Sequence, residues 1–321
     1  MPFAIRIFGV ILALCLAGSA TEARAEKKVK AIASFSILGD MVKNVGGDRV
    51  AVTTLVGPNG DAHVYQPTPA AARAVGGANL VVVNGLGFEG WMDRLIQTSG
   101  YKGPVVVASQ GIKTRAMTSE EKGQPEHGAA KREPKIDPHA WQALSNALFY
   151  VDNIAKGLGS VDPAGAATYQ ANAAAYKGQL IDLDQWVKAE FAAIPEAKRR
   201  MITSHDALGY FGAAYGITIL SSMGVSTESE PSAGDIARLI KQIRGEKITA
   251  VFIENVTDPR LMEQVAKESG ATLGGELYSD ALSNPGEAAP TYIDMFKNNV
   301  TKIVAAMRKG LELKGPRHNS E

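Results

Sequence analysis

Cysteine is almost absent from this sequence of 321 residues. The single cysteine, Cys15, lies in an apolar run, Ile7–Ala17, that follows the cation Arg6. A run of about eleven residues is too short for a membrane-spanning helix, which needs about 20. Small and polar residues follow the run and end in an Ala-x-Ala cleavage pattern at Ala25, as in a secretory signal. We therefore expect residues 1–25 to be removed during export.

The mature chain then has no cysteine, which excludes disulfides and thiolate metal sites. Any metal ion must be bound by His, Asp or Glu side chains. A lipid-attachment cysteine normally follows a small residue, whereas Cys15 follows Leu14. The sequence therefore favours a cleaved signal over a lipid anchor.

An excess of charge of either sign is also missing. Removing residues 1–25 takes two arginines and one glutamate from 34 basic and 33 acidic residues, which leaves 32 of each. Such a balance gives no general attraction to nucleic acid or anionic lipid. No later apolar run reaches spanning length, so we expect a soluble protein. About 296 mature residues exceed what one core usually organises, which favours two lobes.

Short apolar, β-branched runs alternate with stretches of helical spacing, such as Ile37–Val45 and Pro69–Gly76. We expect seven of these runs to form short buried strands: Val29–Ser34, Val50–Val56, Leu80–Val83, Val105–Ala108, Met201–Thr203, Ile217–Leu220 and Ala250–Ile253. Alternation of this kind is typical of parallel sheets with covering helices. Because the order returns later in the chain, we predict an α/β fold of two similar lobes, each with a mainly parallel sheet flanked by helices.

A proline-free stretch, Ala164–Ala193, lies between the lobes, with prolines at its start and just past its end, as at helix boundaries. About thirty residues at 1.5 Å each give a rigid linker helix of about 45 Å. A mobile surface loop is expected at 115–135, which has few apolar side chains. The predicted organisation is a signal peptide at 1–25, an N-terminal α/β lobe at 26–160, a linker helix at 161–195 and a C-terminal α/β lobe at 196–321.

Five histidines occur: His63, His127, His139, His205 and His318. His318 stands in a polar C-terminal tail, where a solvated role is expected. His63, His139 and His205 each follow or join predicted strands. Ligands of open parallel sheets bind beyond the carboxyl ends of the strands, so these three side chains can converge there.

Each candidate ligand also has a purely structural interpretation. His63 precedes a helix start marked by a Thr-Pro pair, so it can be a turn or capping residue. His139 follows Asp137 and a proline, and this aspartate can orient the imidazole. His205 stands where a strand passes into a helix, and Asp280 precedes another segment, so both can be capping residues.

Five short motifs occur in the order seen in one protein family. They are His-x-Tyr-x-Pro-Thr-Pro from His63, Asp-Pro-His-x-Trp from Asp137, Ser204–Phe211, Glu230–Ser232 and Asp280–Leu282. Through these motifs the chain resembles the zinc and manganese solute-binding proteins of bacterial ABC importers, from about Lys30 to Lys309. The resemblance implies two α/β lobes, a rigid linker helix and a metal ion held between the lobes.

By the same resemblance, His63 and His139 are metal ligands from the first lobe, and His205 and Asp280 are ligands from the second. Manganese members commonly present a carboxylate where this chain has His205. Zinc favours about four ligands and accepts imidazole, whereas manganese prefers oxygen. We expect a monomeric periplasmic protein that binds Zn²⁺ as cargo and delivers it to an ABC importer, a membrane permease with its ATPase. A manganese-binding member of the family is the alternative.

A metal-dependent hydrolase is the competing class, with Glu228, Glu230 or Asp206 as its base. The chain has no His-Glu-x-x-His pattern and no Gly-x-Ser-x-Gly elbow. If Asp280 completes the shell, no position is left for an activated water. An organic-ligand binder needs an aromatic-lined cleft, and only three tryptophans are available. We therefore expect that the protein is not an enzyme.

His127 lies in the 115–135 loop near two glutamates. Many zinc members of the family carry a histidine-rich insertion at this place. A single histidine is either a solvated loop residue or a site of transient metal capture. A periplasmic metal donor protein is a further partner that such a role allows.

Overall fold

The computed structural model describes residues 27–117, 135–224, 226–228, 231–248 and 250–312. The expected signal peptide, most of the 115–135 loop with His127, and the tail with His318 lie outside these residues. At the described ends of the loop, the Met117 amide donates to the Lys135 carbonyl oxygen. Within the described residues no helix is both long and apolar enough to cross a membrane.

The first sheet consists of four parallel strands in the order β2-β1-β3-β4. Their bounds are β1 Val29–Phe35, β2 Val50–Val56, β3 Leu80–Val83 and β4 Val105–Val107. All four residues of β3 are buried, and so are six of the seven in β1. These two apolar runs are central because both faces of a helix-covered parallel sheet are buried.

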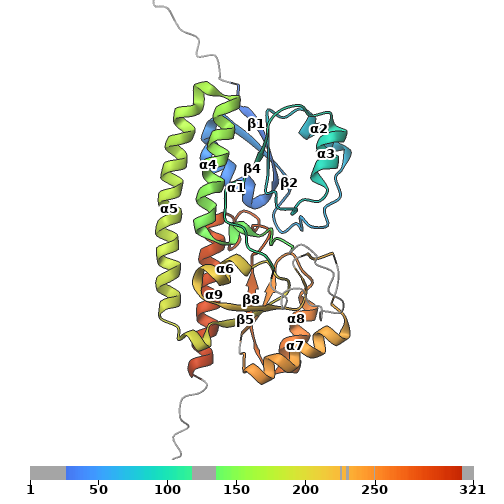
Figure 1. Ribbon diagram of the computed structural model, residues 1–321, viewed down its shortest axis with the longest axis vertical. Helices are drawn as coiled ribbons and strands as arrows, with labels where there is room; N and C mark the ends of the chain where they lie inside the picture. Colours follow the sequence, from blue (N-terminus) through green and yellow to red (C-terminus); the bar gives the residue numbers. More distant parts are fainter. Residues whose placement is uncertain (1–26, 118–134, 225, 229–230, 249, 313–321) are drawn as a thin grey trace, which may run out of the picture.

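The second sheet repeats this order as β6-β5-β7-β8, again all parallel. Its strands are β5 Arg200–Thr203, β6 Thr218–Ser221, β7 Ala250–Glu254 and β8 Thr272–Leu277. The predicted fold of two similar α/β lobes is confirmed (Figure 1). The sequence did not reveal β8, because Gly274 and Gly275 interrupt its apolar pattern. A Cβ atom at Gly274 would meet the Phe252 ring at 2.3 Å, which explains the glycine.

The expectation that every strand is buried is wrong for the outer strands. In β4, Val105 and Val107 are 41% and 38% exposed, and most residues of β2 and β6 are only partly covered. Each of these three strands lies at a sheet edge with one neighbouring strand. A β-branched run therefore identified the strand but not its position in the sheet.

Nine helices connect and cover the sheets in the described residues. They are α1 Ser36–Gly46, α2 Pro69–Gly76, α3 Met92–Ser99, α4 Leu144–Val161, α5 Ala166–Ala192, α6 Gly209–Tyr215, α7 Ala233–Glu246, α8 Pro259–Ser269 and α9 Tyr292–Glu312. The predicted start of α2 is confirmed, since the Thr68 side chain accepts a hydrogen bond from the Ala71 amide.

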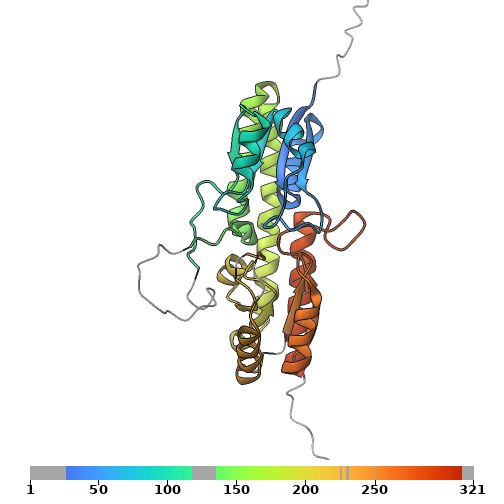
Figure 2. The ribbon, with the colours of Figure 1, turned by 90° about the vertical axis from the view of Figure 1, so that its right-hand side faces the viewer.

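Helix α5 runs along both lobes (Figures 1 and 2). Its 27 residues give a length of about 40 Å. It is shorter than the predicted 161–195 segment because α4 reaches Val161 and a 3₁₀ turn, Pro163–Gly165, precedes α5. Its buried side chains recur every three or four residues, from Tyr169 to Phe191, and it contacts α1 and α4 of the first lobe and α6 and α9 of the second. A helix buried against both lobes is a rigid support.

One apolar core extends from the first lobe across α5 to the side of the second sheet that α9 covers. A smaller core under α7 and α8 includes Ile202 and Val251. The carboxyl ends of the strands of the two sheets lie at the junction of the lobes (Figure 1).

Candidate metal centre

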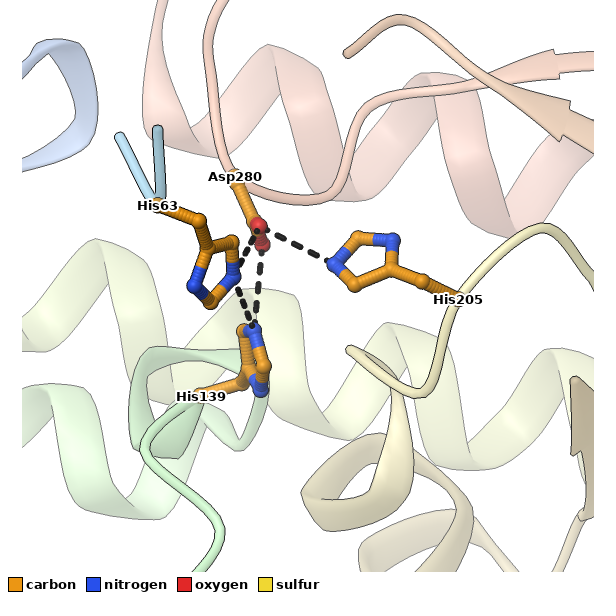
Figure 3. Close-up of side chains that lie close together, drawn as sticks. All are labelled: His63, His139, His205 and Asp280. Carbon is orange, nitrogen blue, oxygen red and sulfur yellow. Dashed lines mark hydrogen bonds and ion pairs between the residues drawn. The ribbon is translucent and has the colours of Figure 1, made fainter. Parts of the chain in front are cut away.

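Three histidines and one aspartate meet at this junction (Figure 3). Asp280 Oδ2 lies 3.2 Å from Nε2 of His63 and 3.0 Å from Nε2 of His205. Asp280 Oδ1 lies 3.6 Å from Nε2 of His139, and the Nε2 atoms of His63 and His139 are 3.3 Å apart. One donor atom of each residue lies within 4.8 Å of all the others, so the group can hold a metal ion.

His63 lies in the segment between β2 and α2. Its backbone amide donates to Asp61 Oδ1 at 2.8 Å, which fixes the turn that carries the imidazole. Thr68, and not His63, caps α2. The interpretation of His63 as a capping residue is therefore wrong, and its side chain points to the other three (Figure 3).

His139 is held by the aspartate that the sequence suggested. Asp137 Oδ1 lies 2.9 Å from Nδ1 of His139 and also accepts its backbone amide at 3.0 Å. The other oxygen, Oδ2, pairs with Arg115 Nη1 at 2.8 Å. Orientation of the imidazole by Asp137 is confirmed, and Nε2 is left to face the centre.

His205 is held by Glu254, which the sequence did not single out. Glu254 Oε1 accepts the His205 backbone amide at 2.9 Å, and Oε2 lies 2.8 Å from Nδ1. Helix α6 begins only at Gly209, with Leu208 at its N-cap, so His205 is not a capping residue. A carboxylate at the end of β7 was the available signal, because β7 lies beside β5 in the sheet.

Asp280 follows β8, yet its segment is bound to the first lobe. The carbonyl oxygen of Ser279 accepts hydrogen bonds from Trp141 Nε1 at 3.0 Å and Gln142 Nε2 at 2.6 Å. The Leu282 amide donates to the Ser36 hydroxyl at 2.9 Å. Asp280 Oδ1 is buried and has no hydrogen-bond partner among the described residues, as expected for an oxygen that is available to a cation.

The buried carboxylates and imidazoles shift one another's pKa values. Burial lowers the pKa of His139, but the carboxylates of Asp280 and Asp137 outweigh burial and raise that pKa to about 9. Burial likewise lowers the pKa of His205, and Glu254 with Asp280 raises it well above its usual value. Burial raises the pKa of Asp280, and the two imidazoles hold it well below its usual range. Without a metal ion, protons on these imidazoles supply the compensating positive charge.

Three carboxylates contact the imidazoles, and Arg115 compensates one of them. With neutral histidines, a surplus of two negative charges is therefore buried at the centre. A divalent cation balances this surplus, whereas a monovalent cation leaves part of it uncompensated. The electrostatics of the site therefore fit a divalent ion.

The bases considered for a hydrolase do not belong to this group of four. Asp206 is buried next to His205, and its amide donates to the Gly224 carbonyl oxygen. Glu228 is exposed, and Glu230 lies outside the described residues.

Comparison with known proteins finds metal-binding relatives over most of the chain. Residues 32–306 match the family described as ZnuA, the periplasmic zinc-uptake complex component A. The manganese-binding lipoprotein MntA of Halalkalibacterium halodurans is 34% identical over 305 residues, which cover 95% of this chain and 97% of that protein.

Two solved structures are similar throughout. The periplasmic zinc-binding protein TroA of Treponema pallidum is 30% identical with a TM-score of 0.79, and the match covers 87% of this chain and 99% of TroA. The manganese-bound periplasmic metal-binding protein of Candidatus Liberibacter asiaticus is 32% identical with a TM-score of 0.75, and 87% of this chain and 100% of that chain are covered.

The family match spans most of the chain, and the relatives share both lobes and the long helix. Members of this family bind a solute for transport and are not enzymes, so the expectation of a non-enzyme is confirmed. The chain belongs to the ZnuA family, the extracytoplasmic metal-binding proteins that serve ABC importers.

Proposed function

We propose that this protein is a periplasmic zinc carrier in which His63, His139, His205 and Asp280 bind one Zn²⁺ and release it to the permease of an ABC importer. The convergence of three imidazole nitrogens and one carboxylate supports this proposal most strongly. Zinc binds nitrogen and oxygen ligands at metal–ligand distances of about 2.0–2.1 Å. In a tetrahedral shell with these distances, neighbouring ligand atoms lie about 3.3 Å apart. Four contacts between donor atoms, at 3.0 to 3.6 Å, are close to this spacing, and one donor atom of each residue lies within 4.8 Å of the others.

Manganese is the second candidate, favoured by the manganese-binding relatives. Manganese prefers oxygen ligands and a higher coordination number. Asp280 offers a second oxygen, Oδ1, that has no hydrogen-bond partner in the described part of the chain. The nitrogen-rich shell argues against manganese. Within this shell, substitution of His205 should change the selectivity most.

Metal analysis of the purified mature protein, followed by competition between zinc and manganese, tests the proposed cargo. We expect one zinc ion per chain and at least a hundredfold preference for zinc, about 2.7 kcal/mol. Equal affinities, or a preference for manganese, would contradict zinc as the cargo.

A paired substitution tests the role of position 205. His205→Glu alone would place a carboxylate against Glu254, which now lies 2.8 Å from the imidazole. We therefore expect His205→Glu with Glu254→Gln to move the preference towards manganese, because a harder oxygen donor replaces a nitrogen. An unchanged zinc-to-manganese ratio in a folded double variant would show that position 205 does not set selectivity.

We further propose that the protein is free in the periplasm after cleavage near Ala25. The residue before Cys15 is Leu14, which supports a cleaved signal over lipid attachment. Intact mass spectrometry of the exported protein should give the mass of a chain that begins at Glu26. A lipid-modified Cys15 would instead make it an anchored lipoprotein like its relative MntA.

His127 is proposed to capture metal transiently, since it lies near Glu120 and Glu121 in the sequence. Deletion of residues 118–132 should leave equilibrium zinc affinity nearly intact and slow the uptake of zinc from a competing chelator. A large loss of equilibrium affinity would make His127 a direct ligand, and equal uptake rates would remove any capture role.

A further inference from the structure

A cavity of about 410 Å³ lies beside the metal centre, mainly in the second lobe. Its lining includes Asp61 from the first lobe and Ser204 from the second. These two residues are close neighbours in sequence of His63 and His205. None of the four proposed ligands lines the cavity, so it is a space separate from the centre, next to the segments that carry His63 and His205.

His63 is the ligand nearest to solvent. Its side chain is 6% exposed, whereas the side chains of His139, His205 and Asp280 are fully buried. An ion that leaves the centre therefore has the least protein to displace on the side of His63.

The two lobes are joined more firmly on the side of Asp280 than on the side of His63. Ser279 accepts two hydrogen bonds from the first lobe. The Leu282 amide donates to Ser36, and its carbonyl oxygen accepts from the Asn59 amide at 2.9 Å. On the His63 side, by contrast, the Thr227 hydroxyl donates to Asp61 Oδ2 at 2.6 Å and joins the lobes through two side chains. A contact between two side chains breaks more readily than a set of hydrogen bonds that involves the backbone.

The cavity also offers oxygen atoms to a cation. The hydroxyl of Ser204 is buried and has no hydrogen-bond partner among the residues described. Asp61 adds a carboxylate to the lining, whereas the carboxylate of Asp258 is paired with Arg260, which lines the cavity as well. If Thr227 releases Asp61 Oδ2, that oxygen becomes free to contact a hydrated cation while Oδ1 still holds the His63 amide.

We propose that the metal ion enters and leaves the centre through this cavity, past Asp61 and His63, and that the hydrogen bond between Thr227 and Asp61 closes the route. The inference rests on the proposed metal site and adds the path of exchange. It concerns the rates of exchange, because the hydrogen bond of the Thr227 hydroxyl goes to Asp61 and not to one of the four ligands. Opening the route should therefore speed binding and release together, with little change in affinity.

Stopped-flow measurements with Zn²⁺ and a chromophoric chelator test this route on the mature protein. Thr227→Val removes the hydroxyl and keeps the shape of the side chain. We expect it to raise both the association and the dissociation rate of zinc by about fivefold or more, with Kd within about threefold of the parent. A second variant, Leu261→Trp, narrows the cavity and should slow both rates.

Tyr210→Phe is the matched control. It removes another hydroxyl that joins the lobes, the acceptor of the Arg115 amide, but Tyr210 does not line the cavity. Zinc rates in this control should stay within about twofold of the parent. Unchanged rates in both cavity variants, or an equal acceleration in the control, would overturn the proposed route. Parent-like zinc affinity in His63→Ala would instead overturn the proposed metal site, whatever the rates.

Discussion

The two buried histidines of the centre are fixed in different ways by their carboxylates. His139 uses a single oxygen of Asp137 for its amide and its Nδ1, which leaves the other oxygen for Arg115. His205 uses both oxygens of Glu254. Among the described residues no lysine or arginine pairs with Glu254. The first arrangement is electrically balanced, whereas the second contributes an uncompensated negative charge that only the imidazole or a metal ion can neutralise.

The largest effect on zinc affinity should come from removing the ligand nitrogen of His139 or of His205. His139→Ala and His205→Ala should each weaken zinc binding by more than the 10–100-fold typical of outer-shell partners, because each leaves an open ligand position. Chelator competition measures the loss, and circular dichroism checks the fold. Parent-like affinity in both variants would exclude this centre as the zinc site.

The next largest effect should differ between the two carboxylates that hold the histidines, Glu254 and Asp137. Glu254→Gln should weaken zinc binding by about 10–100-fold, since its amide group would face either the His205 amide or its Nδ1 as a second donor. Asp137→Asn can keep one oxygen for both contacts to His139, so its loss should be several times smaller. Equal losses by calorimetry would show that the difference in geometry has no consequence.

Zinc affinity should rise with pH up to about 9. In the metal-free protein the raised pKa values of His139 and His205 keep both imidazoles protonated at neutral pH, and each proton must leave before its nitrogen binds zinc. Release of two protons corresponds to about a hundredfold change in affinity per pH unit. Above pH 9, where His139 loses its proton anyway, the slope should decrease. Titrations between pH 6 and 10 measure this slope.

The same titrations, repeated with Glu254→Gln, test whether Glu254 is the group that raises the pKa of His205. Loss of this carboxylate removes the main charge that raises the pKa of His205, so the slope should fall towards one proton per zinc ion. An affinity that stays flat across the range would contradict a shell of buried histidines.

The smallest effect concerns Arg115. Arg115→Gln leaves Asp137 uncompensated and makes it resemble Glu254, which adds negative charge near the ion. We expect zinc affinity at pH 9 to increase by no more than about threefold, because the guanidinium is partly solvated and screened. A marked loss of affinity would show that Arg115 holds Asp137 in place and does not merely balance its charge.

Much of the fold was predictable because its strands are short apolar runs and α2 begins with a Thr-Pro pair. Strand β8 was missed since two glycines interrupt its apolar pattern, of which Gly274 packs closely against Phe252. Edge strands were predicted as buried because strand order is a property of the sheet and not of the local sequence.

The four candidate ligands were found through motifs, and the structure brings them together. Asp137 was predictable since it stands two residues before His139. Glu254 was not, because 49 residues separate it from His205 and only the pairing of β5 with β7 makes them neighbours. The attachment of the Asp280 segment to the first lobe was hidden for the same reason, since Trp141 and Ser279 are 138 residues apart.

A crystal structure of the zinc-loaded mature protein, with anomalous scattering recorded at the zinc edge, tests the central claim most directly. We predict one strong anomalous peak, bound by Nε2 of His63, His139 and His205 and by the carboxylate of Asp280. A zinc ion bound elsewhere in the chain, or a peak here without these nitrogens as ligands, would contradict the account.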